Sequence, residues 1–277
     1  MTGRSAPIGV FDSGFGGLTV VSALQRLLPG QEVIYLGDSA RQPYGPRQLA
    51  DVRRMSLECL DQLVGFGVKA VVIACNTASA AVVRDARERY QVPVIEVVGS
   101  ASRMAASATK NFRIGVVCTE ATRVSRAYED SFAAAPHINL ITKACPPFVD
   151  FVEAGVTTGP ELASVTQQYL TPLVEADIDT LILGCTHYPL ISEAIAGVMG
   201  ERVGLVSSAE AAAHDLAACL NRLDLCRPIS AGRPSHLFLT TGDVEYFEDI
   251  GSRFLGLPFP GDGTGEASEA VFAAATP

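Results

Sequence analysis

The sequence predicts an α/β fold of two similar domains, each a central, mainly parallel sheet flanked by helices, with the active site in the cleft between them. Short apolar runs alternate with longer segments of helical periodicity along the chain. This alternation is typical of βαβ units, which form parallel sheets covered by helices. The apolar runs are continuous rather than interleaved with polar residues, as expected for strands that are buried on both faces. The same pattern then restarts after about residue 100.

The first half supplies four predicted strands separated by amphipathic helices. Two of these helices lie at residues 18–28 and 51–67, where apolar residues recur at helical spacing. The four predicted strands cover residues 8–11, 32–36, 70–74 and 93–98.

The second half repeats the first, because each of its strands follows its counterpart by 105 to 111 residues. This constant spacing indicates a duplication. A further strand at 236–243, followed by a helix at 244–256, is expected to return to the first sheet. The predicted strands of the second half cover residues 113–117, 138–142, 180–184 and 203–207. The predicted first domain is 1–98 plus 208–258, the second is 99–207, and 259–277, rich in Gly, Ala and Thr, is a predicted flexible tail.

Bulk composition narrows the class of protein. The chain has 277 residues, 48% of them hydrophobic, which is enough for a sizeable core. No apolar stretch approaches the ~20 residues of a membrane span, and the N-terminus has no signal-peptide pattern, so a cytoplasmic protein without membrane contact is expected. A net charge of -9 argues against nucleic-acid binding and favours a small-molecule ligand.

Cysteine usage excludes the common cysteine-rich sites. The 7 cysteines are odd in number and form no Cys-x-x-Cys pair, which argues against a disulfide framework and against a zinc or iron–sulfur centre. No metal is therefore expected. Two cysteines differ from the others in their setting: Cys75 and Cys185 each follow the third predicted strand of a half, 110 residues apart. Since ligands of parallel sheets bind beyond the carboxyl ends of the strands, these two thiols are expected to face each other across the cleft.

Two opposed thiols can remove a proton from one face of a carbon and deliver another to the opposite face, which inverts a stereocentre. One must start as thiolate and the other as thiol. An ordinary thiol is only roughly 3% ionised at pH 7, so neighbours must assist. Asp12, at the end of the first strand, and His187, two residues after Cys185, are the candidates, and Glu153 is expected to orient His187.

Neutral donors near the strand ends favour a substrate with carboxylates. Hydroxyl and amide side chains follow several strands, and the segment 13–17 (SGFGG) offers backbone N–H groups. An amino acid with a second carboxylate fits this set. The same glycine-rich segment matches neither the P-loop nor the dinucleotide-binding pattern, so a nucleotide site is disfavoured. The candidate donors are Ser13, Asn76, Thr77, Thr119 and Thr186.

Four ordered motifs, IGVFDSGFGGLTV, YLGDSARQPYG, ACNTASA and LGCTHYPL, resemble those of the glutamate racemases in the aspartate/glutamate racemase superfamily. The resemblance extends from about residue 7 to about residue 256. It implies a cofactor-independent racemase that interconverts L-glutamate and D-glutamate by a two-cysteine, two-base proton transfer. It also implies a cytoplasmic homodimer that supplies D-glutamate for bacterial peptidoglycan, and hence for the cell wall and cell shape.

The resemblance further implies roles for individual residues. Cys75 is expected to deprotonate D-glutamate and Cys185 to deprotonate L-glutamate, with Asp12 and His187 assisting them. The implied ligand-contacting pairs are Asp12–Ser13, Tyr44–Gly45, Asn76–Thr77 and Thr186–His187.

Three alternatives stay open at this point. A Cys-His hydrolase would use Cys185 as nucleophile and His187 as base, but side chains two residues apart at a strand end are expected to diverge, and Cys75 would have no role. A racemase of a related acidic amino acid, such as aspartate, is closer to the motifs. A non-catalytic amino-acid binding module would also have two similar lobes, but it has little use for paired thiols.

Overall fold

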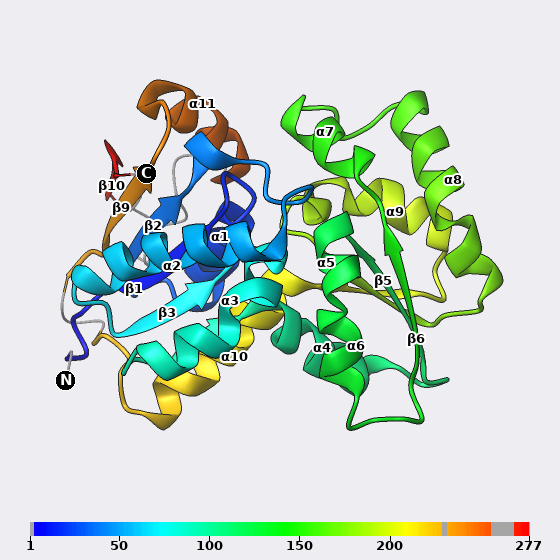
Figure 1. The fold of residues 1–277 in the computed structure, drawn as a ribbon, viewed down its shortest axis with the longest axis horizontal. Helices are drawn as coiled ribbons and strands as arrows, with labels where there is room; N and C mark the ends of the chain where they lie inside the picture. The colour runs from blue at the N-terminus through cyan, green and yellow to red at the C-terminus, as the bar shows by residue number, and fades with distance from the viewer. Residues whose placement is uncertain (1–2, 229–231, 256–268, 277) are drawn as a thin grey trace.

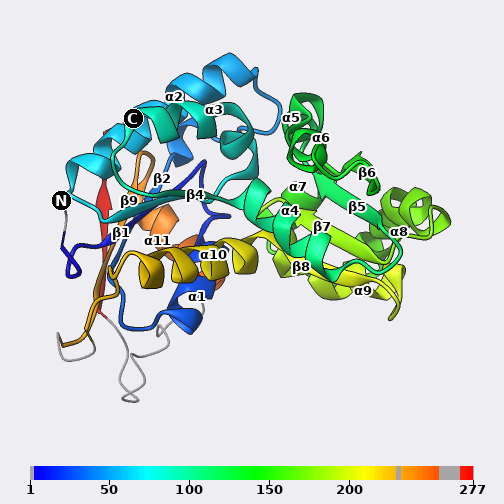
Figure 2. The same ribbon diagram turned by 90° about the horizontal axis from the view of Figure 1, so that it is seen from below.

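The structure is a computed structural model that describes residues 3–228, 232–255 and 269–276. It contains two parallel sheets that lie beside one another, each covered by helices (Figures 1 and 2). The first sheet has the strand order β10-β9-β2-β1-β3-β4, and the second has the order β6-β5-β7-β8. The predicted α/β class is confirmed.

The first-sheet strands are β1 (Ile8–Asp12), β2 (Val33–Gly37), β3 (Ala70–Ile73), β4 (Val94–Glu96), β9 (Ser235–Thr240) and β10 (Glu269–Ala274). The second-sheet strands are β5 (Arg113–Cys118), β6 (Asn139–Ala144), β7 (Thr180–Gly184) and β8 (Gly204–Ser207). Every pairing between these strands is parallel. As predicted, β9 returns to the first sheet, where it pairs with β2.

The duplication predicted from spacing is visible in the topology. In the first sheet the first four strands stand in the order second, first, third, fourth, and the four strands of the second sheet repeat that order. The registers also correspond, because Ile8 pairs with Ala70 in one half and Ile114 pairs with Thr180 in the other. The exact domain boundaries at 98/99 and 207/208 stay a prediction.

Helices cover both faces of the first sheet because alternate residues of its buried strands point to opposite sides. One face, with Val10 and Val72, packs against α1, α10 and α11, and the other, with Phe11 and Ile73, packs against α2 and α3 (Figure 2). These helices are α1 (Leu18–Leu27), α2 (Leu49–Gly65), α3 (Asn76–Arg89), α10 (Ser208–Arg222) and α11 (Val244–Leu255), with a 3₁₀ turn η1 (Ser39–Arg41) after β2.

The second sheet is built in the same way. Val117 and Leu183 belong to the apolar cluster under α7, α8 and α9, whereas Val116 and Ile182 belong to the cluster under α4 and α6. The helices of this half are α4 (Val97–Ala108), α5 (Glu120–Ser125), α6 (Ala127–Phe132), α7 (Pro147–Glu153), α8 (Pro160–Glu175) and α9 (Ser192–Met199), with η2 (Tyr188–Ile191) after β7.

The predicted flexible tail is corrected over residues 269–274, which form β10 at the edge of the first sheet. The ring of Phe272 explains this strand: it stacks on Phe238 at 5.1 Å between centroids and contacts Phe247. An apolar run, VFAA, follows the Gly- and Ala-rich composition of this region and is long enough to pair with β9. Residues 259–268 and 277 of the predicted tail lie outside the described residues.

In the described ranges, no helix combines the length and the apolar character that crossing a bilayer requires.

All strands of each sheet run in one direction, so their carboxyl ends gather at one edge. The segments after β1, β2 and β3 meet those after β5, β6 and β7 at these edges.

Candidate active site

A cavity of about 230 Å³ lies where the strand-end segments of the two sheets meet. Its first-half wall is made by segments after β1, β2 and β3, and its second-half wall by segments after β5, β6 and β7. The lining residues are Ser13, Gln42, Pro43, Tyr44, Gly45, Pro46, Cys75, Asn76, Thr77, Thr119, Glu120, Pro146, Val149, Asp150, Glu153, Cys185, Thr186 and His187.

Cys75 caps the N-terminus of α3 and is only 5% exposed. The backbone N–H of Ala78 donates to its Sγ at 3.4 Å. Burial raises the pKa of the Cys75 thiol to about 12, and the nearby Asp12 carboxylate also raises it, while hydrogen bonds from Ser13 and Ala78 lower it. Cys75 is therefore a protonated thiol at neutral pH.

Cys185 follows β7, is 6% exposed, and contacts a histidine. Its Sγ lies 3.7 Å from His187 Nδ1, and His187 Nε2 lies 3.3 Å from Glu153 Oε1, at the end of α7. Burial lowers the pKa of His187, but the contacts with Cys185 and Glu153 outweigh it and raise that pKa to about 10. At neutral pH His187 is therefore an imidazolium, placed to stabilise a thiolate on Cys185.

The contact between Cys185 and His187 corrects an expectation from the sequence. Their side chains were expected to diverge at the end of the strand. The strand ends at Gly184, and His187 already has helical backbone angles (φ -77°, ψ -32°) before η2. The chain therefore curls, and the imidazole returns to the thiol.

Asp12 lies beneath the cavity rather than among its described lining residues, and it is fully buried. Its Oδ2 accepts the backbone N–H of Gly14 at 2.9 Å, whereas its Oδ1 has no hydrogen-bond donor among the described residues. Burial raises the pKa of Asp12, and the charge of His187 lowers it. Since Asp12 also raises the pKa of Cys75, this carboxyl group is within electrostatic reach of both walls.

The neutral donors predicted from the sequence line the cavity. Asn76 Nδ2 donates to the Tyr128 hydroxyl at 2.9 Å, and its buried Oδ1 has no partner in the described part of the chain. The Thr77 and Thr119 hydroxyls, from opposite walls, lie 2.9 Å apart. Ser13 and Thr186 complete the set. Hydroxyl, amide and backbone donors of this kind suit carboxylate groups.

Comparison with known proteins adds a family to this geometry. Residues 10–216 match the model of the Asp/Glu/Hydantoin racemase family. The chain therefore belongs to the Asp/Glu/hydantoin racemase family. It is 58% identical over 251 residues to the glutamate racemase of Parafrankia sp. (strain EAN1pec), and the alignment covers 91% of each chain.

Two solved members of this racemase family share the fold. A glutamate racemase from Thermus thermophilus in complex with beta-chloro-D-alanine has a TM-score of 0.84 and 43% identity, over 94% of this chain and 96% of that one. A glutamate racemase from Francisella tularensis subsp. tularensis SCHU S4 in complex with D-glutamate has a TM-score of 0.86 and 32% identity, over 99% and 97% of the two chains.

Sequence reasoning missed several residues that line the cavity of this racemase-family chain. Gln42 and Pro43 stand in the same motif as Tyr44, so their position in it was the available signal. The other missed residues come from the start of α7 and are Pro146, Val149 and Asp150. They carry no comparable signal, because the same residue types are common at the starts of ordinary helices.

A glycine keeps the two walls close together. A Cβ on Gly16 would lie 2.3 Å from Thr186 Oγ1 and 2.6 Å from His187 Nδ1, so only glycine fits without moving these groups. The Thr19 hydroxyl also donates to the Thr186 carbonyl at 3.0 Å. The turn after β1 therefore sets the position of the Cys185–His187 segment.

The racemase-family cavity thus holds two thiols with unequal surroundings. Cys75 is beside a carboxyl group and Cys185 is beside an imidazolium. This arrangement brings two thiols to opposite walls of one cavity. Within the described ranges, no group of three or more His, Cys, Asp or Glu side chains is arranged to hold a metal ion.

Proposed function

We propose that this protein interconverts L-glutamate and D-glutamate by two-base proton transfer at the α-carbon, without a cofactor. The observation that carries the proposal is that Cys75 and Cys185 line one cavity from opposite walls, each with a different ionisable neighbour. The 58% identity to a glutamate racemase supports glutamate as the substrate over aspartate.

The proton inventory of the reaction follows from the two settings. Beginning from L-glutamate, the Cys185 thiolate accepts the α-proton, and the electron pair of the broken C–H bond delocalises onto the α-carboxylate. The Cys75 thiol then donates its proton to the opposite face of the carbon, which gives D-glutamate. At the end of the turnover Cys185 is a thiol and Cys75 is a thiolate, and proton exchange with water restores the starting state of both.

The asymmetry of the two thiols supports this order. With a pKa of about 12, the Cys75 thiol is held in its acid form, and ionising it at pH 7 costs roughly 7 kcal/mol. His187 carries a positive charge next to Cys185 at the same pH. We therefore assign the first proton acceptance to Cys185, the residue expected to act on L-glutamate. In this mechanism Asp12 assists proton transfer at the thiols, and Glu153 orients His187.

Solvent deuterium tests the two-base mechanism directly. L-Glutamate is incubated with the protein in deuterium oxide, and optical rotation and α-deuterium are followed together. A thiol donor exchanges with solvent, so the D-glutamate product is expected to carry deuterium while early recovered L-glutamate keeps its proton. Equal labelling of both enantiomers from the start would contradict two separate bases.

Single substitutions identify the two bases. In Cys75→Ser and Cys185→Ser, racemisation is expected to fall by a factor of ~10²–10⁴, because a hydroxyl is a poor acid and base at neutral pH. The matched control is Cys219→Ser, since Cys219 is also 5% exposed but lies on α10 and outside the cavity lining. Near wild-type turnover in either of the first two variants would overturn the mechanism.

The same assay separates the alternatives. Faster exchange with aspartate than with glutamate would favour the related racemase. An acyl-enzyme trapped on Cys185 would favour the hydrolase, which the 3.7 Å approach of His187 alone does not exclude, although Cys75 has no role in it. Binding of glutamate without α-exchange would favour a binding module.

We further propose that the protein works in the cytoplasm as a homodimer and supplies D-glutamate for peptidoglycan. These statements follow from the family resemblance of the motifs. Sedimentation equilibrium checks the dimer, and a single species at the 29.1 kDa mass of one chain would contradict it. Depletion of the protein in its own cells should be relieved by added D-glutamate, and lack of relief would contradict the role in the cell wall.

A further inference from the structure

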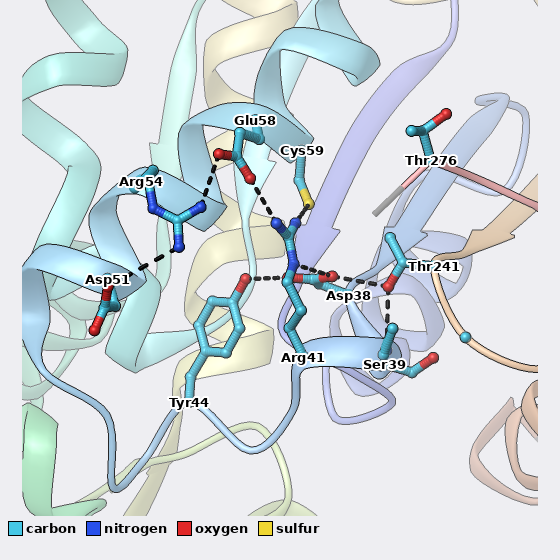
Figure 3. Close-up of polar contacts among 12 residues, drawn as sticks. Asp38, Ser39, Arg41, Tyr44, Asp51, Arg54, Glu58, Cys59, Thr241 and Thr276 are labelled. Carbon is cyan, nitrogen blue, oxygen red and sulfur yellow. Dashed lines mark hydrogen bonds and ion pairs between the residues drawn. The ribbon is translucent and has the colours of Figure 1, made fainter.

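A buried carboxylate outside the cavity holds the loop that forms part of its wall. Asp38 directly follows β2 and is fully buried. Figure 3 shows side chains from two parts of the chain converging on it: Arg41 and Tyr44 from the following loop, and Thr241 from the end of β9. We call these four residues the Asp38 clamp.

The contacts of the clamp are short and involve charge. Arg41 Nε lies 2.9 Å from Asp38 Oδ1 and 2.7 Å from Oδ2, and the Thr241 hydroxyl donates to Oδ1 at 2.8 Å. The Tyr44 hydroxyl donates to Oδ2. On its other side Arg41 reaches α2, where Nη1 lies 2.5 Å from Glu58 Oε2. Charge-assisted bonds of this kind are the stronger class of hydrogen bond, and buried ones hold their partners in one geometry.

The clamp fixes both ends of a cavity wall. Between Arg41 and Tyr44 lie Gln42 and Pro43, which line the cavity together with Tyr44, Gly45 and Pro46. Beyond Tyr44, the Gly45 carbonyl accepts the backbone N–H of Ala121 at 3.0 Å, which ties the loop to the second half. Asp38 itself is anchored, because its backbone N–H donates to the Asp12 carbonyl at 3.0 Å. The loop is therefore held at a fixed position relative to the end of β1, where Asp12, the neighbour of Cys75, lies.

From this connectivity we propose that Asp38 is a positioning residue, which acts through the Arg41 guanidinium and the Tyr44 hydroxyl to hold the 42–46 wall in the geometry that binds substrate. The proposal rests on the proposed glutamate racemase function and deepens it. The Tyr44 hydroxyl serves Asp38, so Tyr44 contributes its backbone and ring to the cavity. The clamp sets how well substrate binds, whereas the thiols set the chemical step.

Two substitutions and their combination test the clamp. Tyr44→Phe keeps the ring and removes the hydroxyl, and Asp38→Asn keeps the shape and removes the charge. Each is expected to raise KM for glutamate by about tenfold while kcat stays within about twofold, since one strong contact is lost and the thiols are untouched. Because both changes break the same contact, the double variant is expected to be no worse than Asp38→Asn alone.

A second Tyr–Asp–Arg set in the chain, whose carboxylate is more exposed than that of Asp38, provides a control outside the cavity. The Tyr90 hydroxyl donates to Asp61 Oδ1 at 2.8 Å, and Arg89 pairs with the same carboxylate at 2.6 Å, but none of these residues is among the described cavity lining. Tyr90→Phe and Asp61→Asn are expected to leave KM unchanged. An equal rise of KM in these variants would mean that the effect is a general loss of stability, and would overturn the proposal.

Hydrogen–deuterium exchange gives a readout that does not depend on turnover. The backbone N–H groups within residues 42–47, where Pro43 and Pro46 carry none, are expected to exchange about tenfold faster in Tyr44→Phe and Asp38→Asn than in the wild type, but not in Tyr90→Phe. Faster exchange in Tyr44→Phe and Asp38→Asn, together with a wild type that fails to racemise glutamate, would leave the clamp standing and remove the proposed function. An active wild type with unchanged exchange and unchanged KM in Tyr44→Phe would remove the clamp.

Discussion

The unequal ionisation of the two cavity thiols can be measured by alkylation of the wild-type protein with iodoacetamide. Cys75 and Cys185 are 5% and 6% exposed, so their accessibility is matched and the rate difference reports thiolate content. With a pKa of about 12, Cys75 is ionised to roughly 3 parts in 10⁵ at pH 7.5. The greater intrinsic nucleophilicity of a basic thiolate recovers part of this deficit. Cys185 is therefore expected to react about 10² times faster than Cys75 or more.

The pH dependence of the Cys75 rate follows from its pKa. Below its pKa, a thiol gains thiolate tenfold for each pH unit, so the Cys75 rate is expected to climb tenfold per unit from pH 7 to 9. Over the same window His187 stays protonated because its pKa is about 10, so the positive charge beside Cys185 does not change.

Substituting the imidazole tests its effect on Cys185. In His187→Gln the positive charge 3.7 Å from the Cys185 thiol is lost, so Cys185 is expected to react more slowly with iodoacetamide at pH 7.5.

The assay is quantitative mass spectrometry of tryptic peptides after quenching. Cys145 and Cys185 fall on one tryptic peptide, residues 144–202, so tandem fragmentation must locate the label. Cys219 on α10 serves as an internal reference for a thiol outside the cavity lining. Alkylation of Cys75 and Cys185 at rates within tenfold of each other, or a flat Cys75 rate between pH 7 and 9, would refute the assignment of Cys75 as a thiol held in its acid form.

Two further substitutions test other parts of the structure. Gly16→Ala should reduce kcat/KM by about 10²-fold or more, because the new methyl group displaces His187 and Thr186. Gly30→Ala is the control and should leave activity unchanged, since the space around its Cβ is open. Equal activity of the two variants would contradict the close approach of the two walls. Phe272→Ala should lower the free energy of unfolding in urea by about 1–3 kcal/mol, because packing on Phe238 and Phe247 is lost. Val271→Ala is the control, at a position 46% exposed, and should change this free energy by less than about 0.5 kcal/mol. A Phe272→Ala variant as stable as the wild type would contradict the pairing of β10 with the first sheet.

Much of the fold could be predicted because buried parallel strands leave a clear pattern. The runs at 8–11 and 180–184 are apolar apart from Thr180 and the glycines, and the structure places β1 and β7 there. The strand at 269–274 was missed because it is an edge strand, which pairs on one side only and is held here by one large side chain, so its sequence pattern is short. Phe272 is that side chain, and its meaning depends on Phe238, which lies far away in the sequence.

The candidate site could be predicted where the duplication marked it. Cys75 and Cys185 occupy matching strand ends, and the structure brings both to one cavity. Their roles as bases stay a prediction. The Asp38 clamp was beyond sequence reasoning, because Thr241 joins Asp38 through a strand pairing between β2 and β9 rather than through any local spacing.

Equivalent positions of the two halves differ in a way that bears on the origin of the chain. By strand register, Asp12 in β1 stands where Cys118 stands in β5, and Thr77 stands where His187 stands after the matching cysteine. An ancestor assembled from two identical copies would have offered identical thiols, with no bias as to which one held the proton. The present difference between the two thiols therefore comes from what each half places beside its cysteine, a carboxyl group in the first half and an imidazole in the second.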